Sequence, residues 1–135
     1  MSSVTNIMQE NQRVFENHQL RIEIIDDVLH AHYKAGIKLT LEDAKYLVSE
    51  RIKLCQGKSY HFMIYDGGVV SMDRDARIYF SSEEGIKGIL SAAFIESSVF
   101  SKMLINFFLK ITTPKVKSKA FTNLEDAMEW IKGFK

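Results

Sequence analysis

The chain has 135 residues, of which 46% are apolar and 26% charged, as in an ordinary globular protein with one domain. Its net charge of +1 gives no general attraction to nucleic acid or to anionic membranes, so we expect no nucleic-acid partner. The single cysteine cannot form an internal disulfide, which fits a cytoplasmic protein. We expect no signal peptide and no transmembrane segment, because no apolar stretch approaches the ~20 residues of a membrane span.

The N-terminal part of the chain predicts an arm followed by a hairpin. Residues 1–17 are polar with scattered apolar side chains, which indicates a flexible arm or a short helix ahead of a single domain at 18–135. Apolar and charged residues alternate over 20–24, and Asp26 and Asp27 then supply turn residues. Because the alternation resumes after this turn, we predict a β-hairpin.

From residue 40 onward, helical and extended patterns alternate. Thr40 and Asp43 lie at the spacing of a capping box, apolar residues then recur at helical spacing, and Gly57 is a natural end signal. The nearly continuous apolar run SYHFMIYD predicts a central strand. The later expected elements are a helix at 74–84, a strand at 86–94, a helix at 97–111, a strand at 115–121 and a helix capped by Thr122 and Glu125.

This order of elements predicts an α/β fold. We expect a mixed sheet of about five strands backed by about four helices, with the later strands parallel. Two segments carry a resemblance to a known family. In GIKLTLEDAKYL a hairpin leads into a helix opened by Thr-x-x-Asp, and KAFTNLEDAMEWIKGF joins a closing strand to a helix with alanine followed by tryptophan three residues on. Over residues 19–134 the chain resembles the STAS-like (SpoIIAA-like) anti-sigma-factor-antagonist domains, in the branch grouped with the CRAL-TRIO lipid carriers.

The resemblance draws attention to the turn after the central strand. In STAS switches this turn carries an Asp-Ser-Ser-Gly-Leu-like motif, whose serine takes a phosphate at a helix N-terminus. The aligned residues 73–77 keep the aspartate and lack both serines, and Ser71 is the nearest hydroxyl. Asp75 either replaces a phosphate or only stabilises the helix dipole. The candidate residues of this regulatory turn are Asp66, Gly67, Gly68, Ser71, Asp73, Arg74 and Asp75.

A response-regulator receiver is a weaker alternative, in which Asp66 accepts the phosphate. That class requires a full helix after Asp27, whereas residues 28–37 alternate like a strand. His30 and His32 share one strand face, but no cysteine or carboxylate at ligand spacing joins them, so we predict no metal and no cofactor.

The segment at 97–111 is more apolar than a helix covered on one side requires. Helices of the same domain, a homodimer contact or a lipid-like ligand can cover it. The candidate residues are Phe100, Leu104, Ile105, Phe107, Phe108 and Leu109. A lysine cluster follows, which either protects a sheet edge or binds an anionic partner. Its members are Lys110, Lys115, Lys117 and Lys119.

No catalytic motif appears in the sequence, and we predict no enzymatic activity. The preferred function is a regulatory or scaffold module that acts through protein contact and associates with itself. The alternative, which the resemblance to lipid carriers implies, is a small carrier or sensor of an apolar ligand.

Overall fold

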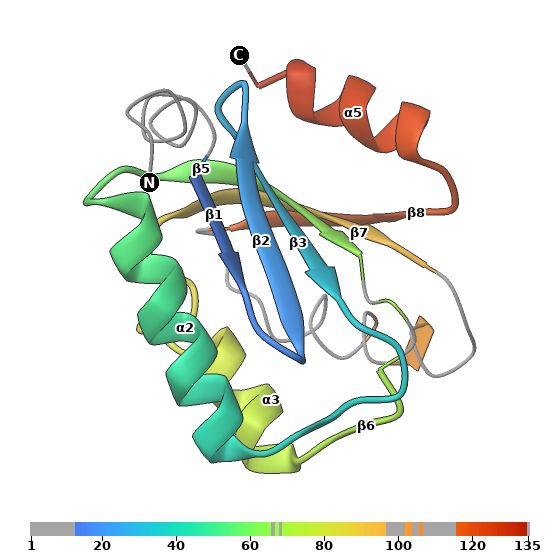
Figure 1. Ribbon diagram of the computed structural model, residues 1–135. Helices are drawn as coiled ribbons and strands as arrows, with labels where there is room; N and C mark the ends of the chain where they lie inside the picture. The colour runs from blue at the N-terminus through green and yellow to red at the C-terminus, as the bar shows by residue number, and fades with distance from the viewer. Residues whose placement is uncertain are drawn as a thin grey trace.

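The structure is a computed structural model that describes residues 13–65, 67, 69–96, 102–103, 106 and 116–134 (Figure 1). The strands are β1 (Arg13–Glu16), β2 (Leu20–Ile25), β3 (Val28–Tyr33), β4 (Lys38–Leu39), β5 (Tyr60–Tyr65), β6 (Ser71–Met72), β7 (Ile89–Ile95) and β8 (Lys117–Phe121). The helices within the described residues are α2 (Leu41–Cys55), α3 (Arg74–Ser81) and α5 (Leu124–Lys132).

Six strands form one mixed sheet in the order β1-β2-β3-β5-β7-β8, and β4 pairs separately with β6. The pairs β1–β2 and β2–β3 are antiparallel, whereas the pairs β3–β5, β5–β7 and β7–β8 are parallel. Parallel neighbours need crossover connections, and α2 and α3 lie in two of them. The predicted α/β class with parallel later strands is confirmed, with six strands in the main sheet rather than about five.

The predicted hairpin is formed by β2 and β3. Asp26 and Asp27 have φ angles of 51° and 67°, the left-handed pair that a two-residue hairpin turn requires, and Ile25 faces Val28 across the turn. Because residues 28–33 are a strand, the chain lacks the helix that a receiver requires at this position.

The N-terminal edge of the sheet corrects one expectation. We predicted an arm or a short helix up to residue 17, but Arg13–Glu16 form β1 and pair with β2. Phe15 holds this strand, because its half-buried ring packs against the core and meets the ring of Tyr46 edge-on at 6.2 Å. Four residues with two apolar side chains give too short a pattern to be recognised from sequence. Residues 1–12 lie outside the described residues.

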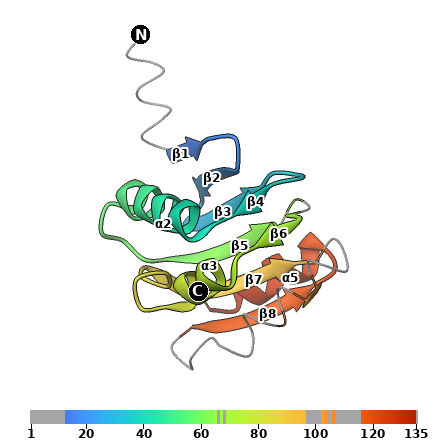
Figure 2. The same ribbon diagram turned by 90° about the horizontal axis from the view of Figure 1, so that it is seen from below.

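Helices lie on both faces of the sheet (Figures 1 and 2). On one face α2 and α3 cover a large apolar core that contains Leu47 and Ile22. On the other face Ala127 and Ile131 of α5 join a smaller core with Met63 of β5. Each fully buried Leu, Ile or Met side chain contributes about 1.5–3 kcal/mol to folding.

Helix α2 begins where the sequence predicts. The Thr40 hydroxyl accepts a hydrogen bond from the Asp43 N–H at 3.2 Å, and the Asp43 carboxylate accepts from the Thr40 N–H at 2.9 Å. At the other end Gln56 and Gly57 have φ angles of 51° and 82°, which stop the helix.

The other two helices differ from expectation at one end. Helix α3 ends at Ser81 rather than near residue 84, because the Ser82 hydroxyl donates to the Tyr79 carbonyl at 2.6 Å and accepts from the Gly85 N–H. The N-cap of α5 is Asn123 rather than Thr122, and its side chain accepts from the Asp126 N–H at 2.9 Å. Both helices nevertheless form in the predicted places.

Candidate functional site

The first candidate site is the turn after β5. Gly67 lies there with a φ angle of 60°, and a Cβ atom at this position would overlap the carbonyl oxygen of Tyr33 at the end of β3. A few residues on, the Val70 N–H donates to the Ile37 carbonyl at 3.0 Å, and β6 pairs with β4. The turn is therefore fixed to the neighbouring chain segment. Asp66 and Gly68 lie outside the described residues.

The remaining turn residues divide into two groups. Ser71 is half-buried in β6, opposite Lys38. Asp73, Arg74 and Asp75 are exposed at the start of α3, where Asp73 is the N-cap and makes no side-chain capping bond. The turn thus presents an acidic helix start and one hydroxyl within a strand pair. A role as a regulatory turn stays a prediction.

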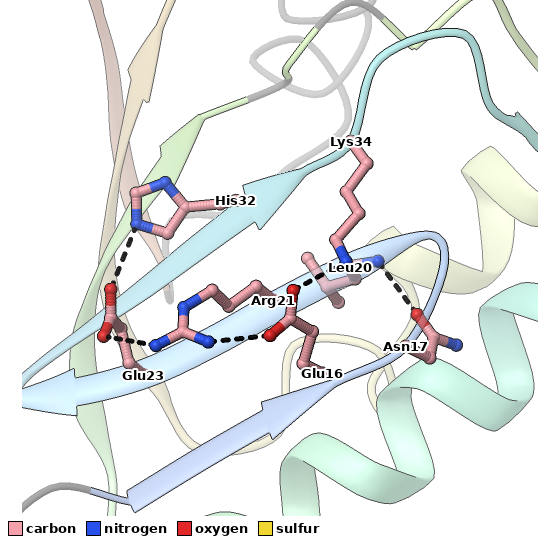
Figure 3. Close-up of polar contacts among 7 residues, drawn as sticks. All are labelled: Glu16, Asn17, Leu20, Arg21, Glu23, His32 and Lys34. Carbon is pink, nitrogen blue, oxygen red and sulfur yellow. Dashed lines mark hydrogen bonds and ion pairs between the residues drawn. The ribbon is translucent and has the colours of Figure 1, made fainter.

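The second candidate site lies on the sheet face that α5 covers in part. Residues of β1, β2 and β3 on this face carry charged and aromatic side chains (Figure 3). The cross-strand register brings them together, because Glu16 faces Arg21 and Arg21 faces His32. We call these side chains, together with Lys34 just after β3 and Tyr65 of β5, the open surface. It consists of Val14, Glu16, Arg21, Glu23, His30, His32, Lys34 and Tyr65.

A chain of ion pairs runs across the open surface (Figure 3). Glu16 accepts from Lys34 Nζ and from Arg21, each at 2.7 Å, and Arg21 also reaches Glu23 at 3.3 Å. His32 Nε2 lies 3.7 Å from the other Glu23 oxygen. The bonds from Lys34 and then Arg21 lower the pKa of the Glu16 carboxyl, which therefore keeps its charge. The side chains stay about 40% exposed at Glu16 and Arg21, so the network faces solvent.

Three rings stack beside this network. The His32 and Tyr65 rings lie 4.1 Å apart and nearly parallel, and the His30 Nδ1 atom lies 3.1 Å from the Tyr65 hydroxyl. Burial lowers the pKa of both histidines below their usual value, with the nearby His32 adding to the effect at His30. The neutral imidazoles therefore predominate at neutral pH. Solvent-facing ion pairs beside stacked ring faces suit non-covalent contact with a partner surface.

Sequence reasoning placed His30 and His32 on one strand face but missed the network around them. Part of the signal was present, because Arg21 and Glu23 alternate along β2 and must share a face. The network could not be predicted because β1, the strand that supplies Glu16, was not recognised in the sequence.

The His61–Ser91 pair and Cys55 are residue types that enzymes use in catalysis, but neither has the geometry that catalysis requires. His61 Nδ1 lies 2.7 Å from the Ser91 hydroxyl, yet Ser91 is 0% exposed and cannot meet a substrate. Cys55 is buried, and this burial raises the pKa of its thiol, which keeps it protonated and unreactive.

An apolar cavity of about 110 Å³ lies on the opposite sheet face, beneath α2 and α3. Arg51 is the charged residue in its wall and is only 7% exposed. The burial of Arg51 was not predicted from the sequence, although Leu47, Arg51 and Cys55 recur every four residues on the buried side of α2.

The apolar and basic segments predicted near the C-terminus are described only in part. Phe100, Leu104, Ile105, Phe107, Phe108 and Leu109 lie outside the described residues, as do Lys110 and Lys115. Within the same segment Lys102, Met103 and Asn106 are helical and exposed. Lys117 and Lys119 are exposed on β8, an edge strand of the sheet. Asp126 and Glu129 line the same shallow hollow as Lys119, which weakens the case for an anionic partner there.

Within the described ranges, no three His, Cys, Asp or Glu side chains are grouped so that they could hold a metal ion. None of the helices in the part of the chain that the structure describes is long and apolar enough to cross a membrane.

Comparisons with known proteins support the fold. A family model described as a domain of unknown function, DUF7793, matches residues 22–135. A crystal structure of an uncharacterised DUF3478 family protein with a SpoIIAA-like fold, from Shewanella loihica PV-4, is similar to the chain with a TM-score of 0.61. The identity is 18%, and the match covers 87% of this chain and 97% of the other. No curated protein matches the chain. The predicted SpoIIAA-like (STAS) fold is confirmed.

Proposed function

The chain belongs to the DUF7793 family of domains of unknown function, and we propose that it is a non-enzymatic regulatory or scaffold module that associates with itself. The single observation that carries this proposal is the open surface. Its side chains are held in place by ion pairs and still face solvent. A surface that is ordered before binding loses less conformational entropy when a partner binds.

The charges of the open surface favour a second copy of the chain as the partner. Arg21 and Lys34 supply two positive charges, and Glu16 and Glu23 supply two negative ones, so the network is balanced. In a two-fold contact each patch meets its own copy, which requires a surface that is complementary to itself. Alternating charges meet this requirement, because a half-turn can place each cation opposite an anion.

Charge-reversal variants test the proposal. The pair Arg21→Glu and Lys34→Glu makes the patch wholly negative, and the pair Glu16→Lys and Glu23→Lys makes it wholly positive. We expect the wild-type protein to dimerise with rising concentration in sedimentation velocity, and each double variant alone to stay monomeric. A mixture of the two should form a heterodimer, because the reversed patches attract each other.

The control is Lys117→Glu, which reverses an exposed charge on β8, far along the sheet order from β1. It should dimerise like the wild-type protein. A wild-type protein that remains monomeric at high micromolar concentration contradicts self-association. So does a dimer that both double variants leave intact.

The second candidate function, binding of an apolar ligand, has one observation in its favour. The cavity beneath α2 and α3 is lined almost entirely by apolar side chains. At about 110 Å³ it is smaller than the roughly 300 Å³ at which pockets for drug-sized ligands begin. Its size therefore favours a small ligand over a lipid. Native mass spectrometry of protein purified from cells tests this candidate, since a bound small ligand adds its own mass.

A further inference from the structure

His30 and His32 are the groups of the open surface whose charge can change near neutral pH. They lie two residues apart on β3, and their nearly parallel rings are 6.3 Å apart. The His32 side chain is 40% exposed, and its Nε2 atom points toward Glu23 (Figure 3). A partner that covers the open surface therefore meets the histidines together with the ion-pair network.

Neighbouring strands place charged and titratable groups against the two rings. On β2, Glu23 faces His30 in the strand register, and one of its carboxylate oxygens lies 3.7 Å from His32 Nε2. Arg21 on the same strand faces His32. On β5, Tyr65 faces His32, and its hydroxyl lies 3.1 Å from His30 Nδ1. Protonation of either ring thus adds a charge beside an existing ion pair.

Two further groups meet β3 at its start. On β5, His61 faces Val28, and its Nδ1 atom lies 2.7 Å from the Ser91 hydroxyl. Helix α5 joins the buried cluster around Val28 through apolar side chains. Within the described residues, the fixed charges that act on His30 and His32 are therefore those of β2.

The charge of the open surface depends on these two histidines. Burial lowers the pKa of both, an effect that Glu23 partly opposes, so at neutral pH both rings are uncharged and the network has two cations and two anions. In mild acid each histidine takes up a proton. The Glu16 carboxyl stays ionised, because its bonds to Lys34 and Arg21 lower its pKa. The surface then has a net positive charge.

A two-fold contact doubles every change of charge, because the same patch lies on both sides of it. We infer that the open surface is a pH-sensitive contact, which joins two copies of the chain at neutral pH and releases them when His30 and His32 are protonated. The release follows because two patches with a net positive charge repel each other. This inference rests on the proposed self-association and adds the regulation of that contact.

Sedimentation velocity at about pH 7.5 and about pH 5, at one ionic strength, tests the inference. The dissociation constant of the wild-type dimer should rise about tenfold or more at the lower pH. In the double variant His30→Gln and His32→Gln, the ratio of the two dissociation constants should fall toward one, whatever the affinity at the higher pH. The control His18→Gln removes an exposed histidine between β1 and β2 and should keep the wild-type ratio.

A second arm uses the wild-type protein alone. Because linkage is reciprocal, a dimer that protonation weakens must hold its histidines at lower pKa values than the monomer does. NMR titration of the imidazole signals at low and high protein concentration should therefore show a lower pKa for His30 and His32 in the dimer. This arm still decides if the double variant fails to fold or to dimerise.

A dimer with the same affinity at both pH values overturns the inference and leaves self-association standing. So does a pH dependence that the double variant retains, and so does an equal pKa of each histidine in monomer and dimer. Loss of the dimer through unfolding, which circular dichroism detects, overturns it too. A wild-type protein that is monomeric at both pH values contradicts self-association itself, and the inference with it.

Discussion

The two faces of the sheet differ in how completely they are covered. On one face α2 and α3 cover a continuous apolar core that spans β2 to β7, with a small cavity inside it. On the other face the nine-residue α5 packs near β7 and β8, and the hairpin strands carry a charged network that remains exposed. One face contains the main apolar core, and the other leaves part of the sheet exposed to solvent.

The connectivity explains this difference. The connections between β3 and β5 and between β5 and β7 join parallel strands, and their helices α2 and α3 both lie over the same face. The strands β1, β2 and β3 are joined by short turns that bring no helix with them. Within the described residues, α5 is the helix on the other face; it shares a buried cluster with Val28 at the start of β3, while the charged side chains farther along β1, β2 and β3 stay exposed. The open surface follows from the topology.

The largest effect expected on stability comes from the covered face. Leu47→Ala removes a side chain that is 1% exposed at the centre of the core, and should lower the free energy of unfolding by about 2–5 kcal/mol. Urea denaturation measures it, with Lys45→Ala on the exposed side of α2 as the control. A loss no larger than that of the control would mean that α2 is not held by this core.

A smaller effect is expected at the start of α2. Thr40→Ala removes the cap bond to the Asp43 N–H and should cost about 1 kcal/mol. The bonds from Thr40 lower the pKa of Asp43. This contribution to stability is thus present above the unfolded pKa of Asp43 and is lost as the pH falls through the folded one. NMR titration of Asp43 should show a higher pKa in Thr40→Ala, because the variant loses the hydroxyl bond to the carboxylate, although it keeps the backbone bond from residue 40. An unchanged pKa would show that the hydroxyl bond does not stabilise the carboxylate.

The open surface should contribute less to folding than either site on α2. The Glu16–Arg21 ion pair is exposed, and such pairs contribute little to stability because solvent screens the two charges. A double-mutant cycle with Glu16→Gln and Arg21→Gln measures the coupling by urea denaturation. A coupling as large as the loss in Leu47→Ala would show that the network is part of the folding core, and would remove the contrast between the two faces.

The smallest effect is a pH dependence that belongs to the open surface. His30 and His32 have folded pKa values below their ordinary value of 6.5, although Glu23 partly opposes the shift. As the pH falls, the unfolded chain therefore takes up protons at a higher pH than the folded protein does. The contribution of the two histidines to stability is present above pH 6.5 and is lost as the pH falls through their folded pKa values. The pair His30→Gln and His32→Gln should flatten the stability curve between about pH 7 and 5. An unchanged slope would show that other groups cause it.

The sequence predicted the features that local chemistry determines. The Asp26–Asp27 turn and the Thr40–Asp43 box follow from the side chains themselves, and the order of strands and helices follows from apolar periodicity. The one-residue error at the α5 cap arose because Thr122 and Asn123 are both good N-caps.

The features missed from the sequence depend on contacts between distant segments. Strand β1 is too short for its pattern to be recognised in the sequence. It is held in place by pairing with β2 and by the contact between the Phe15 ring and Tyr46 of α2. The ion-pair network requires the register of three strands, and the position of Arg51 requires knowing that its acceptors, near residues 85 and 87, lie against α2. Local patterns contain none of these pairings.

The most direct test of the proposed self-association through the open surface compares two exposed valines. Val14 lies on the open surface and is 42% exposed, while Val70 lies after the β5 turn and is 51% exposed. A soluble paramagnetic agent broadens methyl signals that solvent reaches. Self-association through the open surface predicts that Val14 becomes protected as protein concentration rises, while Val70 stays accessible. Equal accessibility of Val14 at all concentrations, or equal protection of both valines, would contradict it.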